Sequence, residues 1–232
     1  RLVALAKAAQ KSKRYLCLLG RSLENMYHIT RAVGAWPDMP KIPGVEHAIT
    51  SNEMFHLEKL PKRLLVYGGG YIANEFAGIF NGLGSDVMLA NRSERLLRGY
   101  DEQIVERMMQ ISIAKGIEVH LNCELERIEK QPDGSLHAYD TKGKGPIVAD
   151  QILIATGRKP NTANLGLENA GVDMDGKGAI KVDDYSRTSC ESIYAVGDVT
   201  DRVQLTPVAI REGHAFADTV FGGNKRTVDY GC

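Results

Sequence analysis

Apolar runs and helical-period stretches alternate through the middle of the chain. The run Arg63–Tyr67 predicts a buried strand, and Tyr71–Gly82 carries apolar residues at helical spacing. A second strand over Asp86–Ala90 and a second helix over Asp101–Lys115, capped by Asp101, follow the same pattern. Because strands that alternate with helices form parallel sheets, this region predicts an α/β fold built on a parallel sheet.

The pattern is less regular on either side. Short strands and turns are predicted for residues 124–149, and loops for residues 158–192. Prolines at 37, 40 and 43 predict an extended connector, because proline fixes φ and removes a hydrogen-bond donor. Further regular elements are expected at Tyr15–Leu19, Ile117–Leu121, Gln151–Ala155, Ile193–Val196 (strands) and Leu205–Phe221 (a helix).

A glycine-rich motif lies between the first predicted strand and helix. Gly68-Gly69-Gly70-Tyr71-Ile72-Ala73 fits the pattern Gly-x-Gly-x-x-Ala. Gly68 permits a tight turn, Gly70 lets a pyrophosphate approach the backbone, and Ala73 lets the helix lie close to the strand. The helix that starts at Tyr71 directs N–H groups and a partial positive charge at the phosphates. We interpret the motif as a dinucleotide-binding turn; a glycine-rich turn without a ligand is the alternative.

The residues after the second strand indicate which dinucleotide is bound. An NAD site places a carboxylate there, about 20 residues beyond the glycines, to bind the ribose 2′-OH. This chain has the neutral Asn91, followed by Arg92 and, six residues later, Arg98. Guanidinium groups bind a 2′-phosphate through charge-assisted hydrogen bonds, so the sequence favours NADP over NAD. A solvated basic loop is the alternative, because Arg95 belongs to the same segment.

Charge and hydropathy exclude some partners. Lys plus Arg and Asp plus Glu number 29 each, so no net charge favours nucleic acid or an anionic membrane. No apolar run approaches the roughly 20 residues that span a bilayer. We therefore expect neither nucleic acid nor a membrane as a partner.

The cysteines and the basic residues near the start of the chain bear on the cellular compartment of the protein. The four cysteines are scattered, and none forms the short-spaced pair typical of a redox or zinc site. We expect free thiols in a reducing compartment, a cytoplasmic location and no metal site. Residues before Glu24 are basic and suit either a surface helix or a transit peptide. The cysteines are Cys17, Cys123, Cys190 and Cys232.

Several motifs occur in this chain in one order. They are Gly-Gly-Gly-Tyr-Ile-Ala-Asn-Glu-Phe-Ala at 68–77, Arg-Ser-Glu-Arg-Leu-Leu-Arg-Gly-Tyr-Asp at 92–101, Ile-Ala-Thr-Gly-Arg-Lys-Pro-Asn at 154–161, Ile-Tyr-Ala-Val-Gly-Asp-Val-Thr at 193–200, and Leu-Thr-Pro-Val-Ala-Ile at 205–210. Together they resemble the glutathione reductase family of pyridine nucleotide-disulfide oxidoreductases, and somewhat less trypanothione reductase. The resemblance runs from about residue 35 to residue 232.

The resemblance implies a relay in which NADPH reduces FAD, and FAD reduces a disulfide that in turn reduces glutathione disulfide. It implies a Rossmann-like NADP-binding domain over residues 59–157, inserted in a partial FAD-binding domain. The flanking pieces are residues 1–58, which include the connector, and residues 158–232. Homodimers are typical of the family.

The resemblance also assigns residues to the two cofactors. Tyr71 matches an aromatic lid over the nicotinamide pocket, Glu75 an acid near nicotinamide and flavin, and Gly157 the turn back into the FAD domain. Asp198 can accept hydrogen bonds from the flavin ribityl hydroxyls, or cap a buried turn instead. The assigned set is Gly68, Gly70, Tyr71, Ile72, Ala73, Glu75, Arg92, Arg98 and Gly157 for NADP, and Gly197, Asp198, Leu205 and Thr206 for FAD.

The sequence departs from the family pattern in three respects. It lacks the family's first Gly-x-Gly-x-x-Gly motif for FAD and the Cys-x4-Cys pair. It also lacks the family's interface domain, which would follow Cys232. We therefore expect a member truncated at both ends, starting at Arg1 rather than methionine, without catalytic residues of its own. A nucleotide-binding module without catalysis is the alternative, and so is an NAD-dependent relative such as dihydrolipoamide dehydrogenase, which Arg92 and Arg98 disfavour.

Overall fold

The computed structural model describes residues 16–18 and 34–231. The chain divides into two compact units: residues 37–157 form one, and residues 158–232 together with 1–36 form the other. The segment 37–58, grouped with the first piece in the sequence interpretation, belongs to the unit 37–157. It is joined there by backbone hydrogen bonds between Ile49 and the strand residues Ile152 and Ile154.

A four-stranded parallel sheet is the centre of the unit 37–157, as the alternating pattern predicts. Its strand order is β5-β4-β3-β9. The central strand β3 pairs with β4 on one side and β9 on the other, so Leu65 lies between Met88 and Ile152. The bounds are β3 Arg63–Tyr67, β4 Asp86–Ala90, β5 Glu118–His120 and β9 Gln151–Ile154.

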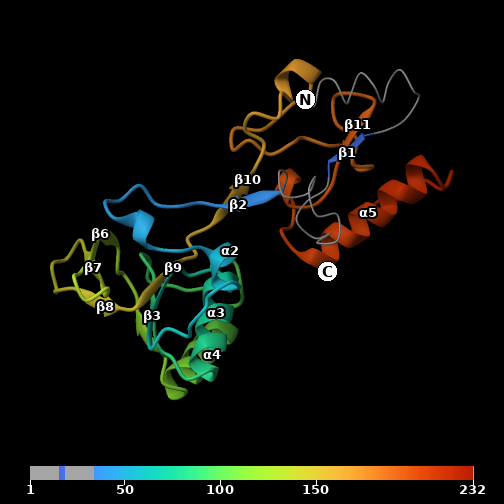
Figure 1. Cartoon of the computed structure of the whole chain (residues 1–232). Helices are drawn as coiled ribbons and strands as arrows, with labels where there is room; N and C mark the ends of the chain where they lie inside the picture. The colour runs from blue at the N-terminus through green and yellow to red at the C-terminus, as the bar shows by residue number, and fades with distance from the viewer. Residues whose placement is uncertain (1–15, 19–33, 232) are drawn as a thin grey trace. The chain divides into compact units, whose positions relative to one another are not determined.

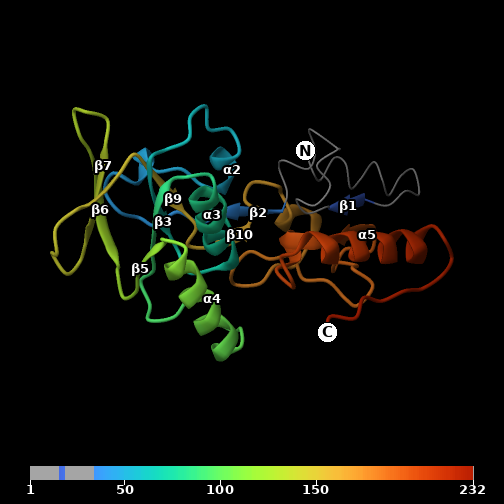
Figure 2. The ribbon, with the colours of Figure 1, turned by 90° about the horizontal axis from the view of Figure 1, so that it is seen from below.

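Helices and a small antiparallel sheet cover the two faces of this sheet. Figures 1 and 2 show α3 and α4 on one side and the sheet β6-β7-β8 on the other. Asp101 caps α4 as predicted, because its carboxylate accepts a hydrogen bond from the Ile104 N–H at 3.1 Å. The bounds are α2 Ser51–Met54, α3 Tyr71–Gly82, α4 Glu102–Ala114, η2 Val45–His47, β6 Leu125–Lys130, β7 Leu136–Asp140 and β8 Ile147–Ala149.

Alternate residues of β3 serve two separate cores. Leu64 and Val66 pack with Phe76 of α3, whereas Leu65 and Tyr67 pack with the residues of β6–β8. All four strand residues are buried, as expected for a strand covered on both faces. Burial on both sides gives the carboxyl end of β3 a fixed position, and the glycine motif starts at that end.

The second unit is built from short elements. Strand β1 (Leu16–Leu18) pairs in parallel with β11 (Ile193–Ala195), and β2 (Ala35–Pro37) pairs with β10 (Arg158–Pro160). Strand β11 continues into η4 (Gly197–Thr200), and Phe216 of α5 (Thr206–Val220) packs against Tyr194 at a ring-centroid distance of 5.1 Å. Residues 158–192 contain only β10 and the short η3 (Glu168–Ala170), which confirms the expected loop-rich segment. Among the described residues, no helix is long and apolar enough to cross a membrane.

Candidate nucleotide-binding site

The turn between β3 and α3 requires glycine at its first position. Gly68 has a φ of 144°, and a Cβ placed on it would lie 2.1 Å from the carbonyl oxygen of Ala155. Its N–H donates to the Ala90 carbonyl at 2.9 Å. The turn therefore passes between the carboxyl ends of β9 and β4, where ligands bind in open parallel sheets.

Gly70, unlike Gly68, has free space where a side chain would begin. It is exposed, its backbone is extended, and a Cβ there would meet no heavy atom within 4 Å. Gly70 is the N-cap of α3 and supplies no side-chain cap, and the first turn of the helix carries no acidic residue. The space beside Gly70, at the uncapped start of a 12-residue helix, is thus open, which fits a pyrophosphate.

The segment after β4 packs against this turn. The Leu97 N–H donates to the Gly69 carbonyl at 2.7 Å, so the arginine-containing segment 91–98 lies beside the glycines. Arg92 and Arg98 are exposed, and in the described part of the chain neither makes a hydrogen bond or an ion pair. Arg95 instead pairs with Glu102 at 3.3 Å. The structure thus distinguishes two uncommitted guanidinium groups from a paired one.

Four of the remaining residues assigned to NADP lie on α3, and the fifth, Gly157, follows β9. Tyr71 and Ile72 are half-buried in the first turn, and Ile72 packs on the core beneath the helix. Ala73 is fully buried, as expected where a helix lies close to a strand. Glu75 is exposed one turn later, and Gly157 is the last residue of the unit 37–157, where its carbonyl accepts from Asp38 N–H at 2.9 Å.

The residues assigned to FAD gather at the start of α5 and the end of β11. Gly197 has a φ of 75°, and Asp198 beside it is buried. Leu205 is the N-cap of α5 without a side-chain cap, and the first turn, which begins at Thr206, has no acidic residue. This turn and helix end would suit an electron-rich ring edge and a hydroxylated chain.

A buried carboxylate next to this turn escaped the sequence interpretation. Glu212 is 2% exposed, and its carboxylate accepts from the Gly197 N–H and from the Tyr230 hydroxyl, both at 2.5 Å. Burial and the bond to Glu212 raise the pKa of Tyr230. The available signal was its position midway between Ala209 and Ala215 on the buried face of α5.

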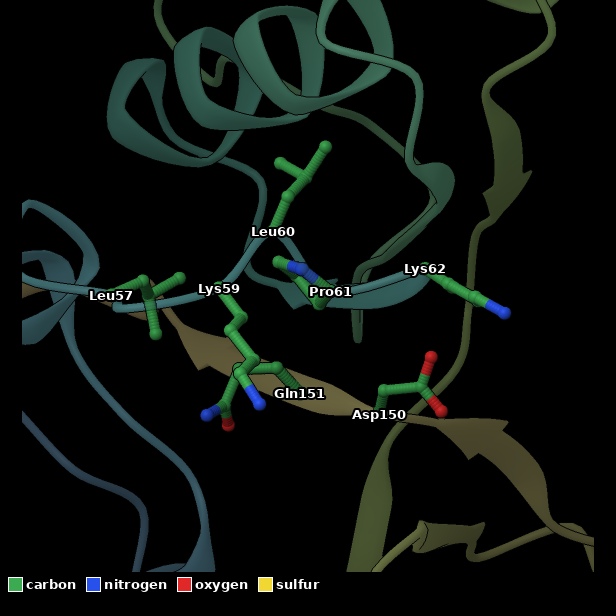
Figure 3. Close-up of a pocket in the computed structure, with 7 residues that line it drawn as sticks. All are labelled: Leu57, Lys59, Leu60, Pro61, Lys62, Asp150 and Gln151. Atoms are coloured by element: carbon green, nitrogen blue, oxygen red, sulfur yellow. The ribbon is translucent and has the colours of Figure 1, made fainter.

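A separate hollow lies at the other end of the same strands (Figure 3). It has a volume of about 310 Å³ and opens between the segment leading into β3 and the start of β9. Arg63 binds Asp150 there at 2.5 Å, and this hydrogen bond, more than any other contact, lowers the pKa of the carboxyl group. Because ligands of parallel sheets bind at the carboxyl ends, we do not assign the nucleotide here. The lining residues are Leu57, Lys59, Leu60, Pro61, Lys62, Asp150 and Gln151.

The cysteines with described side chains show no paired chemistry. Cys123 is buried in the unit 37–157, and burial raises the pKa of its thiol. Cys190 belongs to the other unit, and its sulfur lies 3.7 Å from the Ser192 hydroxyl. Within residues 16–18 and 34–231, no group of three or more His, Cys, Asp or Glu could hold a metal ion.

Comparisons with known proteins of similar sequence and fold point to one family. The model of the pyridine nucleotide-disulphide oxidoreductases matches residues 25–213. Trypanothione reductase of Trypanosoma congolense is 47% identical over 206 residues, an alignment covering 88% of this chain and 42% of that protein. Glutathione reductase of Burkholderia cepacia is 52% identical over 192 residues, covering 83% and 42%.

A solved structure of similar fold points to the same family. The HOCl-induced flavoprotein disulfide reductase RclA from Escherichia coli superposes with a TM-score of 0.78 and 32% identity, covering 84% of this chain and 45% of that one. The chain thus spans less than half the length of these relatives. The resemblance to glutathione reductase and the expected α/β fold are both confirmed. This chain belongs to the pyridine nucleotide-disulphide oxidoreductase family.

Proposed function

We propose that the unit 37–157 binds NADPH, and that the chain is the nucleotide-handling part of a glutathione-reductase-type flavoenzyme. The observation that carries this proposal is the pairing of two features. An open glycine at an uncapped helix start, Gly70, adjoins a segment with two uncommitted guanidinium groups, Arg92 and Arg98. The first suits a pyrophosphate and the second a 2′-phosphate.

The assigned residues of the turn, of α3 and of the segment 91–98 have separate roles in this proposal. Gly68 shapes the turn, Gly70 leaves room for the pyrophosphate, and the backbone N–H groups of the first turn of α3 donate to it. Arg92 and Arg98 bind the 2′-phosphate. Tyr71 and Glu75, on the first two turns of α3, would contact the nicotinamide. Ile72 and Ala73 hold the helix against the sheet.

The flavin assignment rests on the other unit. When bound, NADPH supplies a hydride and FAD passes the two electrons to a disulfide. Asp198 would accept from the ribityl hydroxyls after Gly197, and the start of α5 at Leu205 and Thr206 would place positive charge at the pyrimidine edge. The sequence has no second glycine fingerprint for the FAD phosphates, so we expect this chain to bind FAD weakly or not at all.

For the whole protein, we infer glutathione disulfide as the substrate, a homodimeric assembly and a cytoplasmic location. The relatives named glutathione reductase support the first inference, and the scattered cysteines suit a reducing compartment. The chain by itself lacks a short-spaced cysteine pair, and disulfide exchange needs two thiols within reach of each other. We therefore expect NADPH binding without turnover of glutathione disulfide.

Calorimetric titration with NADPH and NADH tests the nucleotide assignment. Charge-assisted bonds to two exposed arginines should favour NADPH by about 1.5 to 3 kcal/mol in total, or roughly 10- to 100-fold. Replacing Arg92 and Arg98 together by alanine should remove this preference and leave NADH affinity unchanged. The control Arg95→Ala removes one positive charge from the same segment and should keep the preference. Equal affinities of the wild type for both nucleotides would refute the assignment.

A further inference from the structure

Asn91, which follows β4 where an NAD site would have a carboxylate, makes several hydrogen bonds through its side chain. Its side chain is buried, and its Nδ2 lies 2.8 Å from the Arg95 carbonyl oxygen, 2.9 Å from the Ser93 hydroxyl and 3.2 Å from the Ser93 carbonyl oxygen. An amide nitrogen has two protons, and here they meet three acceptors on the segment that carries the arginines. The amide therefore faces this segment.

The same amide lies flat against the glycine turn between β3 and α3. A Cβ on Gly69 would lie 2.8 Å from Cγ, Nδ2 and Oδ1 of Asn91 alike, so the amide plane covers this glycine. The Gly69 carbonyl in turn accepts the Leu97 N–H at 2.7 Å. The arginine segment is thus attached near its start through the side chain of Asn91, and near its end through the backbone of Leu97.

We propose that Asn91 is a positioning residue that sets the preference for NADP over NAD, an inference that rests on the proposed function. By holding the backbone at Ser93 and Arg95, it presents Arg92 and Arg98 beside the turn before the nucleotide arrives. Ordering of long side chains on binding costs free energy, so prior order of their backbone favours the 2′-phosphate. A carboxylate at this position would lack the protons that these carbonyl oxygens accept.

Affinities for NADPH and NADH, measured by calorimetry on the full chain, test this role. Asn91→Leu keeps a branched side chain of similar length over Gly69 but removes the N–H donors. Asn91→Ala, which cannot overfill the site, serves as a second variant if the leucine disturbs folding. The control Asn81→Leu removes an amide that also donates to a backbone carbonyl, that of Lys115 at 3.3 Å, at the far end of α3.

The ratio of the two affinities separates positioning from general damage. Both Asn91 variants should lower the NADPH-to-NADH ratio about tenfold, the scale expected for ordering two long side chains, with NADH affinity retained. Asn81→Leu should leave the ratio unchanged. An unchanged ratio in the Asn91 variants, including an equal loss for both nucleotides, overturns the inference while the arginine assignment survives. A wild type without a preference for NADPH overturns the proposed function and this inference together.

Discussion

Two glycines of the same turn should respond to alanine in opposite ways. In Gly68→Ala the new methyl group would lie 2.1 Å from a backbone oxygen, and φ is 144°. In Gly70→Ala the methyl group would face open space at an ordinary φ of −82°. We expect the first substitution to damage folding, and the second to damage NADPH binding alone.

The two substitutions should differ in their effects on the free energy of unfolding and on NADPH affinity. For Gly68→Ala, the unfavourable φ costs about 1 to 3 kcal/mol, and overpacking between β3 and β9 about as much again. The free energy of unfolding should therefore fall by roughly 2 to 6 kcal/mol. For Gly70→Ala, the poorer N-cap and the less flexible unfolded chain are opposed effects of about 0.5 to 1 kcal/mol each, so stability should stay within about 1 kcal/mol. A methyl group in the pyrophosphate space should lower NADPH affinity roughly 10- to 100-fold.

Urea unfolding followed by circular dichroism, combined with NADPH titration, measures both quantities. Gly78→Ala is the matched control: it lies exposed within α3, with no heavy atom near its Cβ, and should stabilise the helix by up to about 1 kcal/mol without changing affinity. Wild-type NADPH affinity in Gly70→Ala would refute the idea that the open side of this turn holds the nucleotide. A stability loss in Gly70→Ala as large as that in Gly68→Ala would show that the turn packs differently.

Two further predictions concern charge and buried polar groups. Glu212→Leu leaves the Gly197 N–H and the Tyr230 hydroxyl without their acceptor, so the free energy of unfolding should fall by about 1 to 3 kcal/mol and hydrogen exchange at Gly197 should accelerate. Glu212→Gln keeps an acceptor oxygen and should lose less stability, whereas a leucine variant as stable as the wild type would contradict this role. Asp150 has a lowered pKa in the folded chain, so its bond to Arg63 stabilises above the ordinary carboxyl pKa and is lost as the pH falls through the folded value. The difference in unfolding free energy between wild type and Asp150→Asn, below about 1 kcal/mol for a half-exposed pair, should therefore vanish as the pH falls below the lowered pKa of Asp150. A difference that persists in acid would contradict this role of the ion pair.

Local pattern sufficed to predict much of the fold. The bounds of β3, α3 and β4 agree with the sequence interpretation, because strand and helix periods and the glycine punctuation lie within a few residues of each other. The attachment of residues 37–58 to the unit 37–157 was not predicted. Met39, Ile42 and Val45 pack in the cluster on the far face of the sheet, which includes residues of β6 and β9, and no local signal encodes such distant contacts.

Part of the candidate site could also be predicted from local pattern, and part depends on contacts between distant residues. The turn at Gly68 and Gly70 and the arginine segment follow from a motif and its spacing, and the structure places the two side by side. The sequence interpretation treated Asn91 as a missing carboxylate, because the direction of its amide depends on the path of the following backbone. Glu212 was missed because its partners lie 15 residues before it and 18 after it.

If the turn after β3 and the segment 91–98 together bind NADPH, a nuclear magnetic resonance titration of the intact wild-type chain should show it at both places. We predict that NADPH shifts the amide signals of residues 68–73 and of residues 91–98. NADH, which lacks the 2′-phosphate, should bind more weakly and shift mainly the first group. Saturating NADPH that leaves both groups unmoved, or that shifts signals around the hollow at Lys62 and Asp150 instead, would contradict this assignment of the nucleotide site.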